Sequence, residues 1–107
     1  MEPHRLAEAR SLAYHRLVAD RLAAEPAILT RARARVAVWL QQTPPPYYAL
    51  QWAERLAGKL PALQDFLVDP GEEAVELRQS TPFAGAIDPR ERWRLWREVA
   101  ERLQDPQ

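Results

Sequence analysis

The chain has 107 residues, equal numbers of basic and acidic side chains, and no cysteine. Its length fits one domain with a modest core, and the lack of cysteine excludes disulfides, thiol catalysis and thiolate metal sites. The zero net charge excludes a strong overall field that would attract nucleic acid, and no apolar run reaches the roughly 18–20 residues that span a bilayer. The first five residues are not followed by an apolar stretch, so we expect no secretory signal and a cytoplasmic location.

Prolines divide the chain into six stretches with helical character, because proline is tolerated at the first position of a helix and disrupts its interior. Apolar side chains recur with helical spacing in the second and the last of them, and no alternating β-branched run indicates a strand. We therefore predict an all-α fold: a single compact bundle of five or six short helices over residues 1–107. The expected helices span about 3–24, 26–42, 47–57, 61–68, 70–79 and 89–103.

Two of these helices carry clear start signals. Asp69 and Asp88 each precede a proline and are followed three residues later by a glutamate. This is a variant of the capping box, in which the aspartate accepts hydrogen bonds from the first helical N–H groups. We expect the fifth and sixth helices to begin at these positions.

The segment 80–87, here named the arm, resembles neither a helix nor a simple linker. Thr81 precedes a proline, which favours an extended backbone, and Gly85 permits a turn. Phe83 and Ile87 need apolar surroundings, which either the core of this chain or a groove on a partner could provide. Both interpretations stay open, because a loop of this length in a small domain is often functional.

If the arm binds a partner, the start of the last helix should take part as well. Phe83 and Trp93 would supply buried apolar area, while Arg78 and Arg92 would pair with acidic groups. The residues predicted to contact a partner are Arg78, Ser80, Thr81, Pro82, Phe83, Gly85, Ile87, Arg92 and Trp93.

An arginine-rich stretch supports an alternative function, that of a nucleic-acid-binding transcriptional regulator. Arg31 and Arg35 are four residues apart and share one helix face, whereas Arg33 points elsewhere. A basic helix can contact phosphates. Few arginines on a neutral chain give little affinity from counterion release, so this alternative is less favoured.

A second alternative is enzymatic. Arg10 and His15 resemble the active motif of HEPN ribonucleases, in which the histidine is a general acid or base and the arginine steadies phosphate charge. Five positions along a regular helix place the two side chains about 140° apart, so we expect solvated side chains and predict no catalytic residue. The acidic residues between 65 and 76 lack the spacing of a metal loop, and we expect neither a metal nor a cofactor.

Arg10 shares an otherwise apolar helix face with Arg21. The two side chains either reach around the edge of the core, or pair with acids of a partner or with Glu72, Glu73 and Glu76 of this chain.

Two segments resemble a known group of proteins. Leu12–Ala19 reads Leu-Ala-Tyr-His-Arg-Leu-Val-Ala, and Leu77–Gly85 is followed by Glu91-Arg92-Trp93. Both are similar to segments of small bacterial proteins whose genes lie beside toxin genes and which are regarded as antitoxins of toxin–antitoxin modules. The resemblance implies a non-enzymatic bacterial protein that binds and neutralises a toxin enzyme encoded by a neighbouring gene. It leaves open whether the chain also forms a homodimer.

Overall fold

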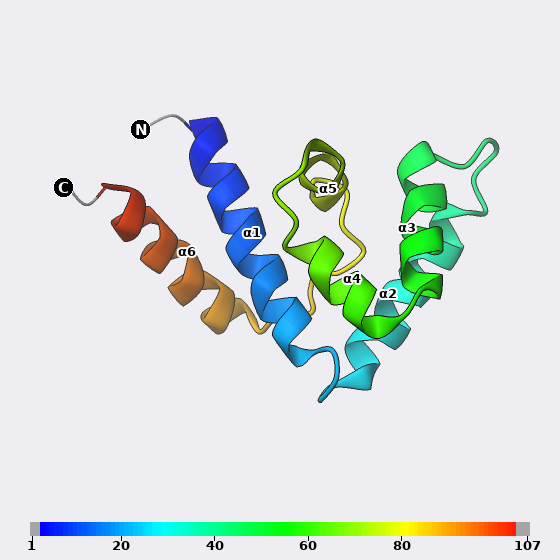
Figure 1. The fold of residues 1–107 in the computed structure, drawn as a ribbon, viewed down its shortest axis with the longest axis horizontal. Coiled ribbons are helices and arrows are strands. Elements are labelled where there is room, and N and C mark those ends of the chain that lie inside the picture. The colour runs from blue at the N-terminus through cyan, green and yellow to red at the C-terminus, as the bar shows by residue number, and fades with distance from the viewer. Residues whose placement is uncertain (1–2, 105–107) are drawn as a thin grey trace.

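The computed structural model in Figure 1 describes residues 3–104. This part of the chain is all-helical, as predicted, and contains no strand. Its elements are α1 (Pro3–Arg21), α2 (Pro26–Trp39), α3 (Tyr47–Ala57), α4 (Leu60–Leu67), α5 (Glu72–Arg78) and α6 (Pro89–Gln104). The prediction of a small all-α bundle is confirmed, and each helix begins within two residues of its expected first residue.

Helices α1 and α2 end earlier than expected, at Arg21 and Trp39. Both are followed by a turn and then a proline, and the residue before a proline disfavours helical backbone angles. After α1, the N–H of Glu25 still donates to the Arg21 carbonyl over 2.8 Å, which closes the turn before α2 begins at Pro26.

The start signals are confirmed for α6 and only in part for α5. The Asp88 carboxylate accepts a hydrogen bond of 2.8 Å from the N–H of Arg90, as an N-cap should. The Asp69 carboxylate accepts one of 2.7 Å from the N–H of Gly71, but Gly71 is itself the residue before the helix. Asp69 therefore stabilises the turn that leads into α5, and α5 begins two residues later than expected.

The helices are arranged around α1. This helix packs against α4, α5 and α6, while α2 pairs with α3. In Figure 1, α6 lies along the outer edge beside α1, the pair α2–α3 lies on the opposite side, and α4 lies between them. None of the helices within residues 3–104 combines the length and the apolar character needed to cross a bilayer.

The core forms where the arm meets the helices. Trp52 and Phe83 are its largest fully buried side chains, and their ring centroids lie 6.0 Å apart in an edge-to-face arrangement. The indole N–H of Trp52 donates to the Leu77 carbonyl over 3.2 Å, so its one polar atom is satisfied. The end of α5 and the arm are thereby fixed to α3.

Candidate functional site

The arm is folded onto the protein and its apolar side chains lie in the core. Phe83 is 1% exposed and Ile87 is 2% exposed, so in this structure the chain's own core surrounds them. The backbone consists of turns: the N–H of Ala86 donates to the Phe83 carbonyl over 3.1 Å, and Gly85 has a positive φ of 81°. Only the tip of the arm, Ala84 and Gly85, is exposed.

Tyr14 of α1 holds the arm from one side. Its hydroxyl donates to the Phe83 carbonyl over 2.6 Å and accepts from the N–H of Ala86 over 3.2 Å. These two backbone groups belong to the same turn of the arm, so one side chain fixes both of its ends. Tyr14 is 6% exposed, and hydrogen bonds in such a buried position are costly to leave unmade.

His15, the next residue, holds the arm at a second point. Its Nδ1 lies 2.7 Å from the Ser11 carbonyl and therefore donates, while its Nε2 lies 2.8 Å from the Thr81 hydroxyl and accepts from it. The Thr81 oxygen also accepts from the N–H of Phe83 over 3.0 Å. The expectation that His15 is solvated was wrong, because the ring is 1% exposed. Its neighbours on the arm could not be identified from the spacing within one helix.

Burial determines the protonation state of His15. Desolvation lowers its pKa from 6.5 to about 4, the charge of Arg78 acts in the same direction, and the Ser11 carbonyl opposes both. The ring is therefore neutral at pH 7. Both ring nitrogens are engaged in structural hydrogen bonds.

Arg35 reaches the arm from α2. Its guanidinium donates to the carbonyls of Ala84, over 2.8 Å, and of Pro82, over 3.4 Å. Arg31 is exposed on the same side of α2 and lines a small hollow beside the arm. The two arginines predicted for nucleic-acid contact thus lie close to the arm, and Arg35 already has partners within the chain. The nucleic-acid function stays a prediction.

Arg78 lies inside the protein, with only 5% of its surface exposed. One guanidinium nitrogen donates to the carbonyls of Asp69, over 2.8 Å, and of Leu67, over 3.3 Å, which closes the loop between α4 and α5. Desolvation lowers its pKa, while the charges of Asp69 and Glu8 act in the opposite direction. A guanidinium remains charged at neutral pH even so.

Between α1, the arm and α6 lies a pocket of about 360 Å³, here named the arginine pocket. Four of the residues predicted to contact a partner line it: Arg78, Thr81, Gly85 and Arg92. The remaining lining residues are Ala7, Arg10, Ser11, Tyr14, His15, Ala84 and Trp96. The pattern within a single helix could not reveal this site, because it forms only when α1 meets the arm and α6.

Trp93 is the most exposed aromatic residue of the described chain, at 63%. It precedes Trp96 by three positions in α6, and residues three apart lie on the same side of a helix. Trp93 does not itself line the arginine pocket, but its neighbours Arg92 and Trp96 do. The other predicted contact residues of the arm are covered: Ser80 is half-buried and Pro82 is buried.

Arg10 and Arg21 have different surroundings. Arg21 forms an ion pair with Glu91, which attaches the start of α6 to the end of α1. Arg10 is half-buried in the arginine pocket, where one nitrogen donates to the Trp96 carbonyl over 3.5 Å and the guanidinium carbon lies 6.0 Å from the Trp96 ring. Neither arginine pairs with Glu72, Glu73 or Glu76 within the described residues.

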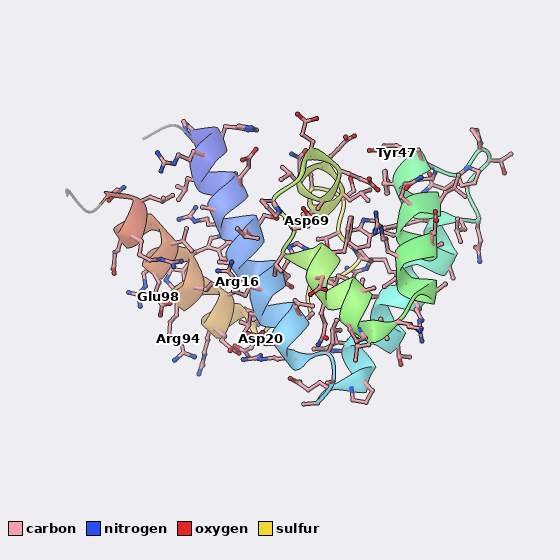
Figure 2. All side chains as sticks on the ribbon, in the orientation of Figure 1. Arg16, Asp20, Tyr47, Asp69, Arg94 and Glu98 are labelled. Carbon is pink, nitrogen blue, oxygen red and sulfur yellow. The ribbon has the colours of Figure 1, made fainter. Side chains whose placement is uncertain are left out.

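A second, larger hollow of about 830 Å³ runs between α1 and α6. Figure 2 labels three of its lining residues, Arg16 and Asp20 on α1 and Glu98 on α6. Charges of both signs line it, together with half-buried apolar side chains such as Leu17 and Leu95. No pattern in the sequence indicated this groove, because charged residues at helical spacing usually lie on a solvated face.

The segments Leu12–Ala19 and Leu77–Gly85, on which the expected antitoxin function rests, are in contact. Tyr14 and His15 belong to Leu12–Ala19, and they form hydrogen bonds with Phe83 and Thr81 of Leu77–Gly85.

Comparisons with protein-family models, curated proteins and solved structures found no match to this chain. Within residues 3–104, no group of three or more metal-ligating side chains is placed to hold an ion.

Proposed function

We propose that this protein binds and inhibits another protein, in the manner of an antitoxin that neutralises a toxin enzyme encoded by a neighbouring gene in a bacterial cytoplasm. The contact surface consists of Trp93, the rim of the arginine pocket and the exposed tip of the arm. This surface retains part of the predicted set, including Trp93, and omits the other predicted anchor, Phe83, which is buried.

The exposure of Trp93 carries the proposal. The other three tryptophans are fully buried or packed against the core, whereas Trp93 leaves 63% of its surface in water. An exposed indole forgoes the burial that makes tryptophan favourable in a core, and tryptophans are enriched among the residues that dominate binding energy at interfaces. Such a residue on a helix that packs mainly against one neighbour is well placed to contact a partner.

The surroundings of Trp93 fit the anatomy of an interface. Interfaces combine a buried aromatic anchor with a polar rim, in which arginine is enriched. Arg92 is exposed on the preceding position, and Gly85 is exposed at the tip of the arm. The arm is held by Tyr14, His15 and Arg35, so binding would not have to order it.

The test is co-expression with the product of the neighbouring gene, followed by affinity capture and size exclusion. We expect a stable complex, and growth inhibition when the neighbour is expressed alone. Trp93→Ala should weaken the complex by about 2 kcal/mol, or roughly thirtyfold. Tyr47→Ala is the matched control, since Tyr47 is 54% exposed and Figure 2 places it on α3, on the opposite side of the molecule from α6.

Two results would contradict the proposal at different levels. A harmless neighbour that forms no complex would remove the antitoxin function. A complex that Trp93→Ala and Tyr47→Ala weaken equally would retain the function and place the contact surface elsewhere.

A further inference from the structure

The arginine pocket concentrates positive charge. Arg10, Arg78 and Arg92 line it, and no acidic side chain does. Within residues 3–104 none of these three arginines forms an ion pair. The charges of Asp69 and Glu8 act on Arg78, but neither residue lines the pocket; Glu8 lines an adjoining hollow. The pocket therefore holds three guanidinium groups, none of which forms an ion pair within the described residues.

Arg10 has hydrogen-bonding capacity that the protein does not use. Its Nε is buried and has no hydrogen-bond partner, a situation found for no other buried side-chain nitrogen or oxygen in the described residues. A terminal nitrogen makes only the long 3.5 Å contact to the Trp96 carbonyl. A buried donor without a partner costs free energy, which a small shift toward an anionic oxygen in the pocket would recover.

The pocket also has an aromatic wall. The rings of Tyr14 and Trp96 lie edge-to-face with their centroids 5.9 Å apart, and Trp96 is only partly buried. Because the Tyr14 hydroxyl is bonded to the arm, its ring is held in place. The volume of about 360 Å³ is within the range of small-molecule sites.

We propose that the arginine pocket binds a small organic phosphate that carries a flat ring. The phosphate oxygens accept hydrogen bonds from Arg10 and Arg92, whose planar guanidinium groups suit phosphate geometry. Arg78 adds a third positive charge to the pocket lining. A phosphate monoester carries nearly two negative charges at neutral pH, which matches this cluster better than the single charge of a carboxylate. The ring lies against Trp96.

The pocket is formed within one chain, so it can be tested without the proposed protein partner, whose contact surface includes its rim. The experiment uses the isolated full-length protein and follows its ¹H–¹⁵N NMR spectrum during titration with phenyl phosphate. The reporters are the side-chain Nε–H signals of Arg10 and Trp96. Benzoate and benzyl alcohol, which offer the ring with a single charge or with none, are titrated in parallel.

We expect saturable shifts at both reporters with phenyl phosphate, about tenfold weaker binding of benzoate, and no saturation with benzyl alcohol. Arg92→Gln should weaken phenyl phosphate binding by about tenfold, since it removes one charged contact. Arg92 is exposed, so this substitution should leave the fold intact, and the unchanged backbone spectrum verifies it. Arg94→Gln is the control, since Arg94 is exposed on the same helix and does not line the pocket.

Three outcomes would overturn the proposal. The first is an absence of saturable shifts at Arg10 and Trp96 up to about 10 mM phenyl phosphate. The second is an equal loss of binding in Arg92→Gln and Arg94→Gln, which would indicate general attraction to a basic surface. The third is binding of benzoate as tight as that of phenyl phosphate, which would exclude the phosphate preference.

Discussion

The imidazole of His15 accepts a hydrogen bond from the hydroxyl of Thr81, with 2.8 Å between Nε2 and Oγ1 and 66 positions between the two residues. This contact joins the first helix to the arm. In this direction the bond exists only while Nε2 is unprotonated, because a protonated ring donates there and the Thr81 hydroxyl would have to turn and accept. The direction of this bond therefore depends on the charge state of one buried side chain.

The first prediction concerns acid. The pKa of His15 is about 4 in the folded protein, whereas an unperturbed histidine, as in the unfolded chain, has a pKa of 6.5. Between pH 4 and pH 6.5 the unfolded chain therefore binds more protons than the folded protein. The free energy of unfolding should therefore fall as pH falls through this window, by roughly 1–2 kcal/mol from pH 6.5 to pH 5 for this one group. Urea denaturation at a series of pH values measures the slope.

His15→Asn should lower stability and remove most of that slope, since asparagine does not titrate. His4→Asn is the matched control, because the His4 side chain is 69% exposed, and it should retain the slope. A slope that survives in His15→Asn would show that another group causes the pH dependence.

Tyr14→Phe tests the other attachment of the arm. The substitution keeps the ring and removes the hydroxyl, which leaves the Phe83 carbonyl and the Ala86 N–H without that partner. We expect a loss of about 1–3 kcal/mol in the free energy of unfolding. Tyr47→Phe removes a hydroxyl that bonds an exposed glutamate and should cost less. Equal effects in the two variants would mean that the Tyr14 hydroxyl does not hold the arm.

The backbone conformation of Gly85 leads to a prediction about two glycine substitutions. Gly85 has a φ of 81°, which a residue with a Cβ adopts only with strain, so Gly85→Ala should destabilise the protein by about 1 kcal/mol. Open space surrounds the position, so backbone strain alone is responsible. Gly58 has a φ of −78° and an ordinary contact to the Arg55 carbonyl, and Gly58→Ala should be neutral or slightly stabilising. Thermal unfolding distinguishes them.

Phe83 and Trp93 should separate stability from binding. Phe83→Ala opens a cavity in the core and should cost about 3–5 kcal/mol in the free energy of unfolding. Trp93→Ala removes an exposed ring and should change stability by less than about 0.5 kcal/mol. Denaturation of the isolated variants provides the measurement. A large loss of stability in Trp93→Ala would indicate a structural role and weaken the case for a contact surface.

The fold was largely predictable because the signals that start and end its helices involve residues close together in the sequence. Proline at a helix start, the Asp88 cap and the apolar spacing of the helices depend on residues a few positions apart, and a sequence displays such relations directly. The early end of α2 was harder to predict. The residues after Trp39 keep a helical composition, and the turn there is decided by the prolines that follow.

The candidate site was less predictable because its contacts join distant parts of the chain. Thr81, Gly85 and Arg92 were identified by composition and turn chemistry, yet nothing in the sequence indicated that Tyr14 and His15 hold the arm. The burial of Arg78 was equally hidden. Its partners are carbonyl oxygens, which every residue possesses, so no residue type in the sequence marks them.

The central place of α1 has a consequence for how the chain folds during synthesis. The helices that pack against α1 are α4, α5 and α6, and all of them lie beyond residue 59. The pair α2–α3 can associate as soon as both have left the ribosome, whereas α1 is made before α2–α6 and its packing partners are made after α3. Tyr14 and His15 can form their hydrogen bonds to the arm only when the arm has been made. Of the described helices, α1 is thus made earliest but reaches its native contacts late.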